Sequence, residues 1–464
     1  MGIPPRSRES MRAWAERSYI VRQVLLPAQA FIHTQVVSGA VLLAAALAAI
    51  VWANSPWQES YFDLWETRIV LDVGLFSIEE DLRHWVNEGL MVFFFFVVAL
   101  EIKRELAHGE LSDRRRAALP VAAALGGMAL PAAIYLALNG GGDGARGWGI
   151  PMATDIAFAL GVLALLGPRI PSQVRVLLLA IAIVDDIGAI LVIAAFYSES
   201  ISLEALGVAA LLFLLVVGMI RGGLRNLVPY FIVGALAWVA MLKSGIHPTI
   251  TGVLLGALVP ATPYFGERTF MESAQGLMER FREAINSGDK ETGEALLGQM
   301  EELTQGTEAP LERLERTFHP WISYIVIPVF ALANAGVELS GDLLRDAASS
   351  SVTLGIVLGL LAGKLLGIVG FSWLAVRLGI GSLPRGVGWR HLFGVGLLAG
   401  IGFTVSLFIT GLAFDDLELV SEAKIGILGT SVVAGAAGYG FLRRLTVSGG
   451  AGAPEALERS GPPG

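Results

Sequence analysis

The stretch LLLAIAIVDDIGAILVIAAF, residues 177–196, places two adjacent carboxylates, Asp185 and Asp186, in the middle of an otherwise apolar run. The run is long enough to cross a bilayer as a helix, which needs about 20 residues. A charge at the bilayer centre costs roughly 3 kcal/mol on insertion scales, so such residues usually line an ion or proton path. This stretch therefore predicts a membrane-spanning helix with a functional site at its centre.

Two further apolar runs carry an ionisable residue. ATDIAFALGVLALLG (153–167) contains Asp155, and TLGIVLGLLAGKLLGIVGFSWLA (353–375) contains Lys364. One alternative is a structural ion pair between packed helices. It is disfavoured because three carboxylates and one ammonium cannot neutralise one another. The three runs together predict an ion transporter.

The composition agrees with a polytopic, all-α membrane protein. Of the 464 residues, 54% are hydrophobic and only 16% are charged, whereas a soluble domain carries about 25% charged residues. The mean hydropathy is +0.64. The absence of cysteine from the sequence excludes disulfides, thiolate metal sites and cysteine nucleophiles.

The apolar segments predict about twelve spans, two of them short. They lie at 33–53, 85–107, 117–138, 147–166, 173–197, 203–220, 226–242, 247–260, 320–337, 352–378, 389–413 and 422–442. We expect a cytoplasmic segment at 1–30, a transmembrane domain at 31–445 and a disordered tail at 446–464.

The charges of the loops predict the orientation of these spans. Basic residues such as the run Arg114–Arg116 occupy loops on the side of the N-terminus, and acidic runs such as Glu79–Asp81 occupy the opposite loops. Because positively charged loops stay in the cytoplasm, both termini are expected there.

Two stretches outside the spans have structure of their own. The loop 54–84 contains ETRIVLDVGLFSIEED, whose apolar residues alternate around Gly74 and predict a periplasmic β-hairpin. An isolated hairpin is marginal in water, so pairing across a homodimer would supply the missing partner. The segment 263–318 carries two helical apolar stripes, through Phe270–Ile285 and Leu296–Leu303, and predicts a cytoplasmic helical hairpin. It is either regulatory or an inert insertion.

The adjacent aspartates suit cation and proton exchange. Neighbouring helical side chains point about 100° apart, so Asp185 and Asp186 offer two carboxylates to one cavity, or one to a cavity and one to another helix. A buried carboxylate beside another holds its proton more tightly than usual, and when deprotonated it is a hard oxygen ligand for Na⁺ or Li⁺. Competition for the same oxygens gives exchange if access alternates between the two faces of the membrane.

Two breaks in the spans lie near these charges. Pro151, just before Asp155, interrupts the hydrogen-bond ladder of its helix, and the glycines Gly400 and Gly402 predict a second interrupted helix. We expect Asp155 and Lys364 to compensate the helix ends where the breaks meet. The hydroxyl of Thr154 could help to coordinate a cation.

Lys364 lies near the middle of its run, which predicts an ion pair with a buried carboxylate, most simply that of Asp185. The alternative is that its side chain extends to the membrane interface. Breaking the pair when a proton or cation binds would give the protein a switch.

Seven stretches along residues ~30–445 resemble the NhaA family of bacterial Na⁺/H⁺ antiporters, and they occur in the family's order. They are NEGLMVFFFFVVALEIKREL from Asn87, MATDIAFALGVLALLG from Met152, AIVDDIGAI from Ala182, LKSGIHPTITGVLLG from Leu242, HPWISYIVIPVFALANAGV from His319, GLLAGKLLGI from Gly359 and GLLAGIGFTVSLFI from Gly396.

The resemblance implies twelve helices with inverted repeats and two interrupted, crossing helices, an architecture of which NhaA itself is a known example. It makes Asp186 the main ion-binding carboxylate and Asp185 its partner, with Lys364 as the pairing ammonium and Asp155 and Thr154 at the crossing. It also implies electrogenic exchange of Na⁺ or Li⁺ for H⁺ in a bacterial inner membrane, activation at alkaline pH, and a homodimer joined by the periplasmic hairpin. No cofactor and no nucleic-acid partner are expected.

The family also links cytoplasmic-side positions matching Glu101, Arg104, His247 and Glu315 to the pH response. Each has another explanation. His247 precedes Pro248 at a helix start and could serve in capping or packing, and Glu315 lies in the charged run LERLER, which could be a solvated face. Asn334 is better explained by helix packing than by ion binding.

Three other classes of protein remain as alternatives. An intramembrane aspartyl protease also uses aspartates on two helices, but its catalytic residue is expected after Gly-x-Gly, and Asp186 follows Val184-Asp185. A sodium-coupled organic-anion symporter should have a polar cavity rich in Asn, Gln and Ser, and the spans contain few of these. A channel should have a pore-loop filter, and we find no such sequence.

Overall fold

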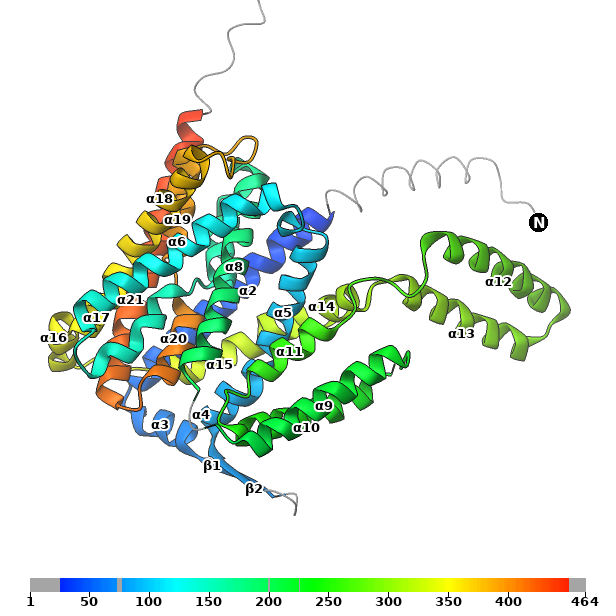
Figure 1. The fold of residues 1–464 in the computed structure, drawn as a ribbon, viewed down its shortest axis with the longest axis horizontal. Helices are drawn as coiled ribbons and strands as arrows, with labels where there is room; N and C mark the ends of the chain where they lie inside the picture. Colours follow the sequence, from blue (N-terminus) through cyan, green and yellow to red (C-terminus); the bar gives the residue numbers. More distant parts are fainter. Residues whose placement is uncertain (1–25, 73–76, 199–200, 225, 450–464) are drawn as a thin grey trace, which may run out of the picture. The chain divides into compact units, whose positions relative to one another are not determined.

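The computed structural model describes residues 26–72, 77–198, 201–224 and 226–449. Within these ranges the chain is largely helical (Figure 1). Most of the predicted N-terminal segment, the turn around Gly74 and the tail from residue 450 lie outside the described residues. The chain divides into two compact units whose boundary on one helix falls between Asp185 and Asp186.

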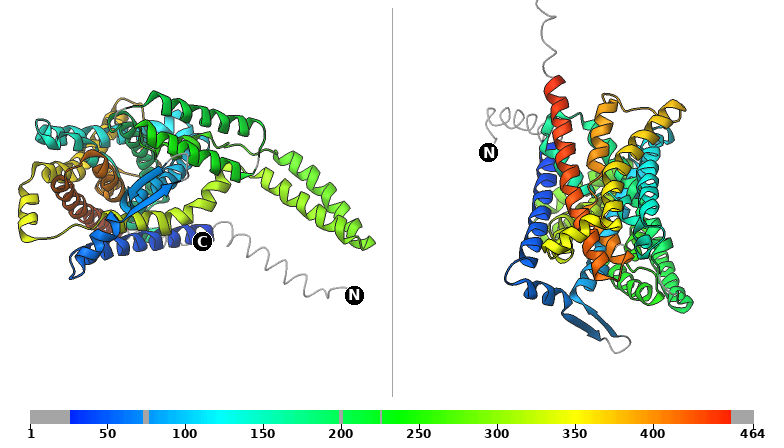
Figure 2. Two further views of the ribbon diagram at one scale, coloured as in Figure 1. Left: turned by 90° about the horizontal axis from the view of Figure 1, so that it is seen from below. Right: turned by 90° about the vertical axis from the view of Figure 1, so that its left-hand side faces the viewer.

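The first unit comprises residues 1–61, 119–185 and 334–464. Its elements are α2 (Leu26–Ala53), most of α6 (Arg114–Asn139), η4 (Asp143–Met152), α7 (Ile156–Leu165), η5 (Gly167–Arg169), the first part of α8 (Ser172–Phe196), α16 (Gly341–Ser349), α17 (Ser351–Leu358), η7 (Gly359–Gly363), α18 (Lys364–Arg377), α19 (Trp389–Ala399), α20 (Phe403–Ala413) and α21 (Leu417–Gly449). Helix α21 packs along α19 (Figure 2). Leu392 and Leu398 of α19 and Leu442 of α21 are fully buried in this core.

The second unit comprises residues 62–118 and 186–333, and α3 (Gln58–Glu66) spans the boundary between the units. Its elements are β1 (Arg68–Asp72), β2 (Ser77–Asp81), α4 (Leu82–His84), η2 (Trp85–Leu90), α5 (Met91–Ala107), η3 (Glu110–Ser112), the rest of α8, α9 (Leu203–Arg221), α10 (Leu227–Ser244), α11 (Ile250–Leu258), α12 (Glu267–Ser287), α13 (Lys290–Thr307), α14 (Pro310–Trp321), η6 (Ile322–Val326) and α15 (Ile327–Asn334). Helix α11 packs on α5, and α9 packs on α10.

Eight helices of the described residues are long and apolar enough to cross a membrane, or up to ten if each of two bent helix pairs counts as one span. The predicted spans at 247–260 and 320–337 are not among these. The first corresponds to α11, which has only nine residues, and the second to the segments η6 and α15 that follow the charged α14. The protein is thus a multi-pass helical bundle, and the count of twelve spans stays a prediction.

Both predicted helix interruptions are present. Segment η4 meets α7 at a bend of 42°, and α19 meets α20 at a bend of 44°. The first break follows Pro151, whose ring leaves no backbone N–H to donate. The residues Ala153–Asp155 between η4 and α7 are non-helical, as are Ile401 and Gly402 before α20. These breaks leave backbone groups unpaired within a span, so other parts of the unit must bond them.

The loop after α3 contains the antiparallel hairpin that the alternating sequence predicts. Strand β1 pairs with β2 in the register Arg68↔Asp81 to Asp72↔Ser77. All five residues of β1 are exposed, including Val70 at 57%. An exposed apolar strand edge offers unpaired backbone groups to another strand.

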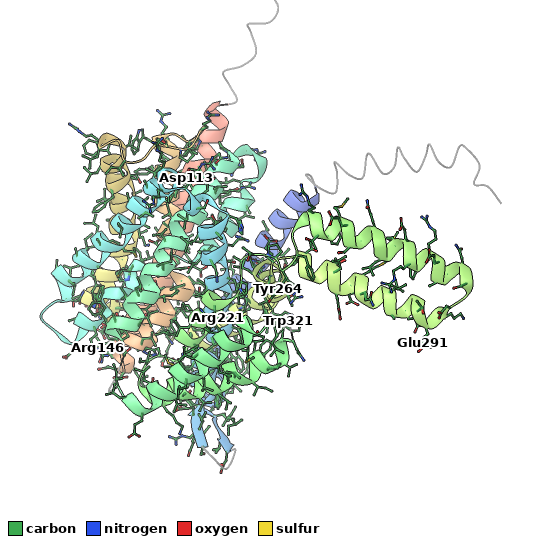
Figure 3. All side chains as sticks on the ribbon, turned by 45° about the vertical axis from the view of Figure 1, so that its right-hand side comes forward. Asp113, Arg146, Arg221, Tyr264, Glu291 and Trp321 are labelled. Atoms are coloured by element: carbon green, nitrogen blue, oxygen red, sulfur yellow. The ribbon has the colours of Figure 1, made fainter. Side chains whose placement is uncertain are left out.

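The segment 263–318 contains the antiparallel helices α12 and α13, which pack on each other through Ala284, Leu296 and Leu303. Charged residues such as Glu291 lie on the outside of this pair (Figure 3). Two members of the predicted apolar stripe, Met278 and Ile285, are 57% and 62% exposed. They lie beside the packed face of α12 and not within it.

Candidate functional site

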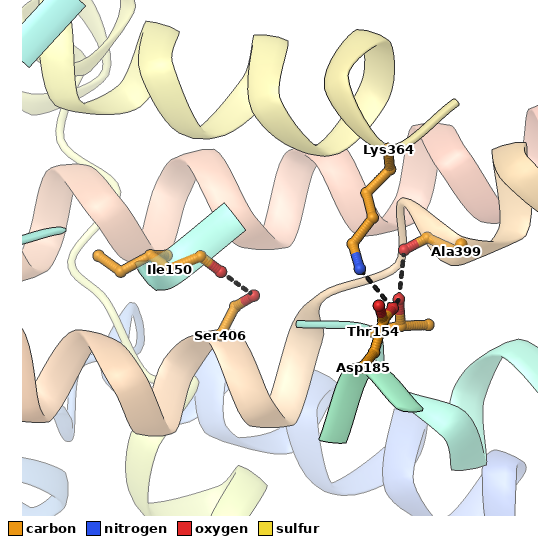
Figure 4. A network of polar contacts seen from close by, with 6 residues as sticks. All are labelled: Ile150, Thr154, Asp185, Lys364, Ala399 and Ser406. Carbon is orange, nitrogen blue, oxygen red and sulfur yellow. Dashed lines mark hydrogen bonds and ion pairs between the residues drawn. The ribbon is translucent and has the colours of Figure 1, made fainter. Parts of the chain in front are cut away.

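The centre of the first unit contains a buried ion pair between Lys364 and Asp185. The Nζ atom of Lys364 donates to Oδ2 of Asp185 at 2.5 Å (Figure 4). Neither side chain has measurable exposure to solvent. Lys364 is the first residue of α18, directly after the π-helical turn η7, and Asp185 lies in the middle of α8. The pairing predicted from the sequence is therefore present.

Thr154 joins this pair to both helix breaks. Its Oγ1 lies 2.9 Å from Oδ2 of Asp185 and 2.9 Å from the carbonyl oxygen of Ala399, the last residue of α19. The hydroxyl has one hydrogen, so it can donate fully to only one of these acceptors at a time. Protonation of Asp185 would therefore change which group accepts from Thr154.

One carboxylate oxygen of Asp185 carries all of these contacts. Oδ2 accepts from Lys364 and Thr154, whereas Oδ1 is buried and has no hydrogen-bond partner among the described residues. Leaving a buried acceptor unsatisfied costs roughly 1–3 kcal/mol. An unpaired buried oxygen of this kind is suited to bind a proton or a hard cation.

Asp155 bonds the N-terminal ends of both half-helices. Its Oδ1 accepts from the backbone N–H of Phe158 in α7, and its Oδ2 accepts from the backbone N–H and the hydroxyl of Thr404 in α20, at 3.0 Å and 2.6 Å. The N–H of Asp155 donates to the carbonyl of Ile401 at 2.7 Å. A carboxylate is stabilised at a helix N-terminus by the helix dipole, and the carboxylate of Asp155 bonds two helix N-termini.

Lys364, which we also expected to compensate the helix ends, donates to Asp185 as its predicted pairing requires, and its compensating role stays a prediction. Ser406 of α20 adds a further link, since its hydroxyl donates to the carbonyl of Ile150 at 2.8 Å (Figure 4). The contributions of Thr404 and Ala399 were missed by the sequence reasoning. Nothing in a local pattern distinguishes these two positions from other residues of an apolar helix.

Asp186 is the next residue of α8 and is 5% exposed. Its side chain points about 100° away from that of Asp185 around the helix. Within the described residues, no three or more His, Asp or Glu side chains gather as metal ligands. Binding of a cation here would therefore need hydroxyl or carbonyl oxygens beside the carboxylates.

Three of the four residues expected to influence the pH response lie together in the second unit. Arg104 of α5 donates from Nη1 to Oε1 of Glu315 of α14, and Glu101 lies one turn before Arg104. Burial raises the pKa of Glu315 above its ordinary value, while the nearby Arg104 guanidinium opposes this rise. These contacts show that Glu315 does not lie on a fully solvated face.

His247 makes its contacts elsewhere, which disagrees with its expected placement on the same side as the other three, whereas its link to the pH response stays a prediction. Its Nε2 lies 2.8 Å from the carbonyl oxygen of Tyr197, and its Nδ1 lies 3.7 Å from Oε1 of Glu88. Glu88 precedes Arg104 by 16 positions along η2 and α5, or about 24 Å at 1.5 Å per residue. His247, in the loop between α10 and α11, therefore lies near the end of the η2–α5 segment that is opposite to Arg104.

Glu88 was also missed by the sequence reasoning. It is 5% exposed, and its Oε2 has no hydrogen-bond partner among the described residues. The available signal was a carboxylate near the start of the predicted 85–107 span. Asn334 is buried at 6% exposure at the end of α15, which fits its expected packing role without testing it.

A multi-pass helical protein with a buried ammonium–carboxylate pair beside two broken helices has the features of an ion transporter. The sequence profile of the family described as Na⁺/H⁺ antiporter 1 matches residues 29–442. The chain therefore belongs to this family, whose members are transporters and not enzymes.

Curated relatives agree over nearly the whole chain. A protein of Sorangium cellulosum named Na(+)/H(+) antiporter NhaA 2 is 50% identical over 423 residues, which cover 90% of each chain. A Myxococcus xanthus protein of the same name is 45% identical over 98% of each chain. A Na(+)/H(+) antiporter NhaA of Rhodopirellula baltica is 48% identical over 90% of this chain and 94% of its own.

Proposed function

We propose that this protein is an electrogenic antiporter that extrudes Na⁺ or Li⁺ in exchange for H⁺ across a bacterial inner membrane. Its role is pH and sodium homeostasis. Family membership and the names of the relatives support the exchange of Na⁺ for H⁺. The observation that carries the proposal is the buried Lys364–Asp185 pair, in which one oxygen of the carboxylate has no partner among the described residues.

In the proposed mechanism, protons and Na⁺ compete for the carboxylates of Asp185 and Asp186. Na⁺ would be held by these carboxylates and the Thr154 hydroxyl. Arrival of a cation or proton at Asp185 weakens its attraction for Lys364, because the carboxylate charge is then shared or neutralised. If one Na⁺ displaces two protons, one from each aspartate, each cycle moves one net positive charge, which makes the exchange electrogenic.

Alternating access would come from movement around the two helix breaks. Asp155 bonds both half-helices, so the breaks can stay paired while the surrounding helices change position. We also propose that the chain has the family architecture of twelve spans with inverted repeats and crossing broken helices. We further propose that both termini are cytoplasmic, that the hairpin joins a homodimer, and that transport needs no cofactor.

The pH response is assigned to the cluster of Glu101, Arg104 and Glu315. A change in the charge of Glu315 would alter its bond with Arg104 and thereby the packing of α14 on α5. His247 remains a candidate for the pH response through its separate contact with Glu88.

Everted membrane vesicles with an acid interior test the transport proposal. Na⁺, Li⁺ or K⁺ is added between pH 6.5 and 8.5 while a dye reports the pH gradient. We expect Na⁺ and Li⁺, but not K⁺, to collapse the gradient with the wild type. Asp186→Asn should abolish the response, because an amide cannot exchange a proton or carry the negative charge.

Asp113→Asn serves as the matched control, since it removes an exposed carboxylate far along the chain from the site. It should transport like the wild type. Antiport by Asp186→Asn at the wild-type rate would overturn the assignment of the site. If the inserted wild type responds to no cation at any pH, the function is wrong, and uptake of organic anions with Na⁺ would then test the symporter alternative.

A further inference from the structure

A polar cavity lies in the first unit, and neither Lys364 nor Asp185 lines it. It has a volume of about 430 Å³ and is enclosed by the end of α6, the start of η4 and the starts of α17 and α21. Its polar lining includes Asn139, Asp143, Ser350, Ser351 and Glu422. None of the described residues that line it is basic.

The amide of Asn139 has a fixed orientation that leaves one acceptor unused. Its Nδ2 donates to the carbonyl oxygens of Ser351 at 2.8 Å and Tyr135 at 3.2 Å. A flipped amide would place its oxygen against these two carbonyl oxygens, so the assignment of O and N is determined by the contacts. The remaining atom, Oδ1, is buried and has no partner among the described residues, and the residue is only 5% exposed.

Glu422 supplies a held carboxylate to the same cavity. It is 9% exposed, and its Oε2 accepts from the hydroxyl of Ser350 at 2.6 Å. The same Ser350 oxygen accepts from the N–H of Val352 and caps α17, so the position of the hydroxyl is set from two sides. Asp143, the exposed first residue of η4, adds a second carboxylate directly after the glycines at 140–142.

We propose that this cavity binds a hard metal cation, with Asn139 Oδ1 and the carboxylates of Glu422 and Asp143 as its protein ligands. Hard cations take carboxylate and amide oxygens, and the acidic pair has a formal charge that Ca²⁺ neutralises. Three protein ligands leave the rest of the coordination sphere to water. We therefore expect weak binding, with a Kd of about 10⁻⁴–10⁻³ M, as in sites of low ligand count.

Such a cation would connect the C-terminal end of α6 and the start of η4 to α21, and the bond between Ser350 and Glu422 would link it to the start of α17. The proposed ligands do not include Asp185, Thr154 or Lys364, the residues of the buried ion pair and its neighbour. The site is thus a structural cation site separate from transport, and its occupancy should stabilise the ends of these three helices.

Binding of ⁴⁵Ca²⁺ to the purified full-length protein in detergent tests this proposal by equilibrium dialysis. We expect one saturable site per chain in the wild type. Glu422→Gln and Asp143→Asn should each raise the Kd at least tenfold. Glu418→Gln, which removes the same charge one turn earlier on α21 from a side chain outside the cavity, should leave the Kd within twofold.

Asp185→Asn distinguishes this site from the transport site and should retain ⁴⁵Ca²⁺ binding. Competition with Na⁺ and Mg²⁺ identifies which hard cation the site prefers. Asp143 is exposed, so Asp143→Asn is expected to fold and still tests the site if Glu422→Gln does not fold. The proposal is overturned if ⁴⁵Ca²⁺ does not bind saturably to the wild type and ²²Na⁺ does not bind saturably to Asp186→Asn, if Asp143→Asn binds like the wild type, or if Asp185→Asn alone abolishes binding.

Discussion

The buried environment of Lys364 leaves little freedom to substitute this residue. It is completely buried and its bond to Asp185 is the contact that offsets the cost of removing both charges from water. A buried pair is weak evidence for net stability, but loss of one partner leaves an uncompensated buried charge. Replacing Lys364 alone and replacing it together with Asp185 should therefore have different effects on stability.

We expect Lys364→Met to destabilise the protein by about 3–5 kcal/mol near neutral pH, where Asp185 would remain buried without its ammonium. The double variant Lys364→Met with Asp185→Asn should recover much of this loss. Unfolding in detergent, followed by tryptophan fluorescence, measures both. Ser372→Ala on the same helix removes a buried hydroxyl with no partner among the described residues and should have little effect. A double variant as unstable as Lys364→Met would show that pairing is not the cause.

The titration of Glu315 predicts a specific dependence of stability on pH. Burial raises its pKa in the folded protein above the ordinary value of 4.5, with Glu312 and Glu105 contributing in the same direction. Arg104 has the opposite effect, and Glu101 is the further carboxylate that faces the group. The folded state therefore holds the proton of the Glu315 carboxyl more tightly than the unfolded state does. The stability that this protonation contributes is present below pH 4.5 and is lost as the pH rises through the pKa of Glu315 in the folded protein.

Glu315→Gln keeps this position neutral at every pH. Its unfolding temperature relative to the wild type should rise as the pH increases above about 4.5. Scanning calorimetry of both proteins at several pH values measures the difference. Glu294→Gln, at an exposed position of α13, is the control and should show no such trend. A constant difference between Glu315→Gln and the wild type would contradict the raised pKa.

At the level of elements, α11 depends on glycine for its close approach to α5. A Cβ atom at Gly252 would lie 2.1 Å from the carbonyl oxygen of Val92, and one at Gly256 would lie 2.7 Å from the Cβ of Ala99. Neither the backbone of α5 nor a methyl group on it can yield without moving the helix. This contact lets a nine-residue helix pack tightly in the second unit.

Gly252→Ala should therefore destabilise the protein by about 1–3 kcal/mol, the usual range for overpacking. Gly298→Ala in α13 is the matched control, because nothing lies within 4 Å of its added methyl. It should be neutral or stabilise by up to about 1 kcal/mol, since alanine favours the helix. Unfolding temperatures in detergent report both changes. Equal effects of the two substitutions would show that close packing of α11 on α5 is not decisive.

At the scale of the whole molecule, the hairpin is the feature that points beyond a single chain. Strand β1 is exposed along its length, with the apolar residues Ile69, Val70 and Leu71 between 40% and 57% exposed. A two-stranded sheet is marginal by itself, so pairing with the hairpin of a second copy would extend the sheet.

Replacing residues 69–80 by a short Gly-Ser linker should convert the proposed dimer into a monomer. The sodium response in vesicles should persist, because none of the replaced residues contacts Lys364, Asp185 or Thr154. Light scattering of the detergent-purified protein measures the mass of the assembly. Arg68→Gln is the control, since it removes only the exposed ion pair with Glu79 and should keep the dimer. A deletion variant that remains dimeric would exclude the hairpin as the interface.

Sequence patterns predicted the Lys364–Asp185 pair, which the structure contains, because the signal was local. A charged residue inside an apolar run is conspicuous, and Lys364 was the one ammonium among three buried carboxylates. Pro151 and the glycines around Gly400 identified the helix breaks. The short helices were harder to predict, because hydropathy does not show that α11 ends after nine residues.

The membrane class, the two broken helices, the hairpin and the buried charges could all be predicted from the sequence, because each follows from hydropathy or from residues that act on their own backbone. The packing of the helices was needed to show that Asp155 bonds Thr404, that Thr154 reaches Ala399, and that His247 lies at the other end of α5 from Arg104. These contacts depend on how each helix is rotated against its neighbours. In a membrane the lipid-facing and protein-facing sides of a helix are both apolar, so the sequence has little periodic signal to fix that rotation.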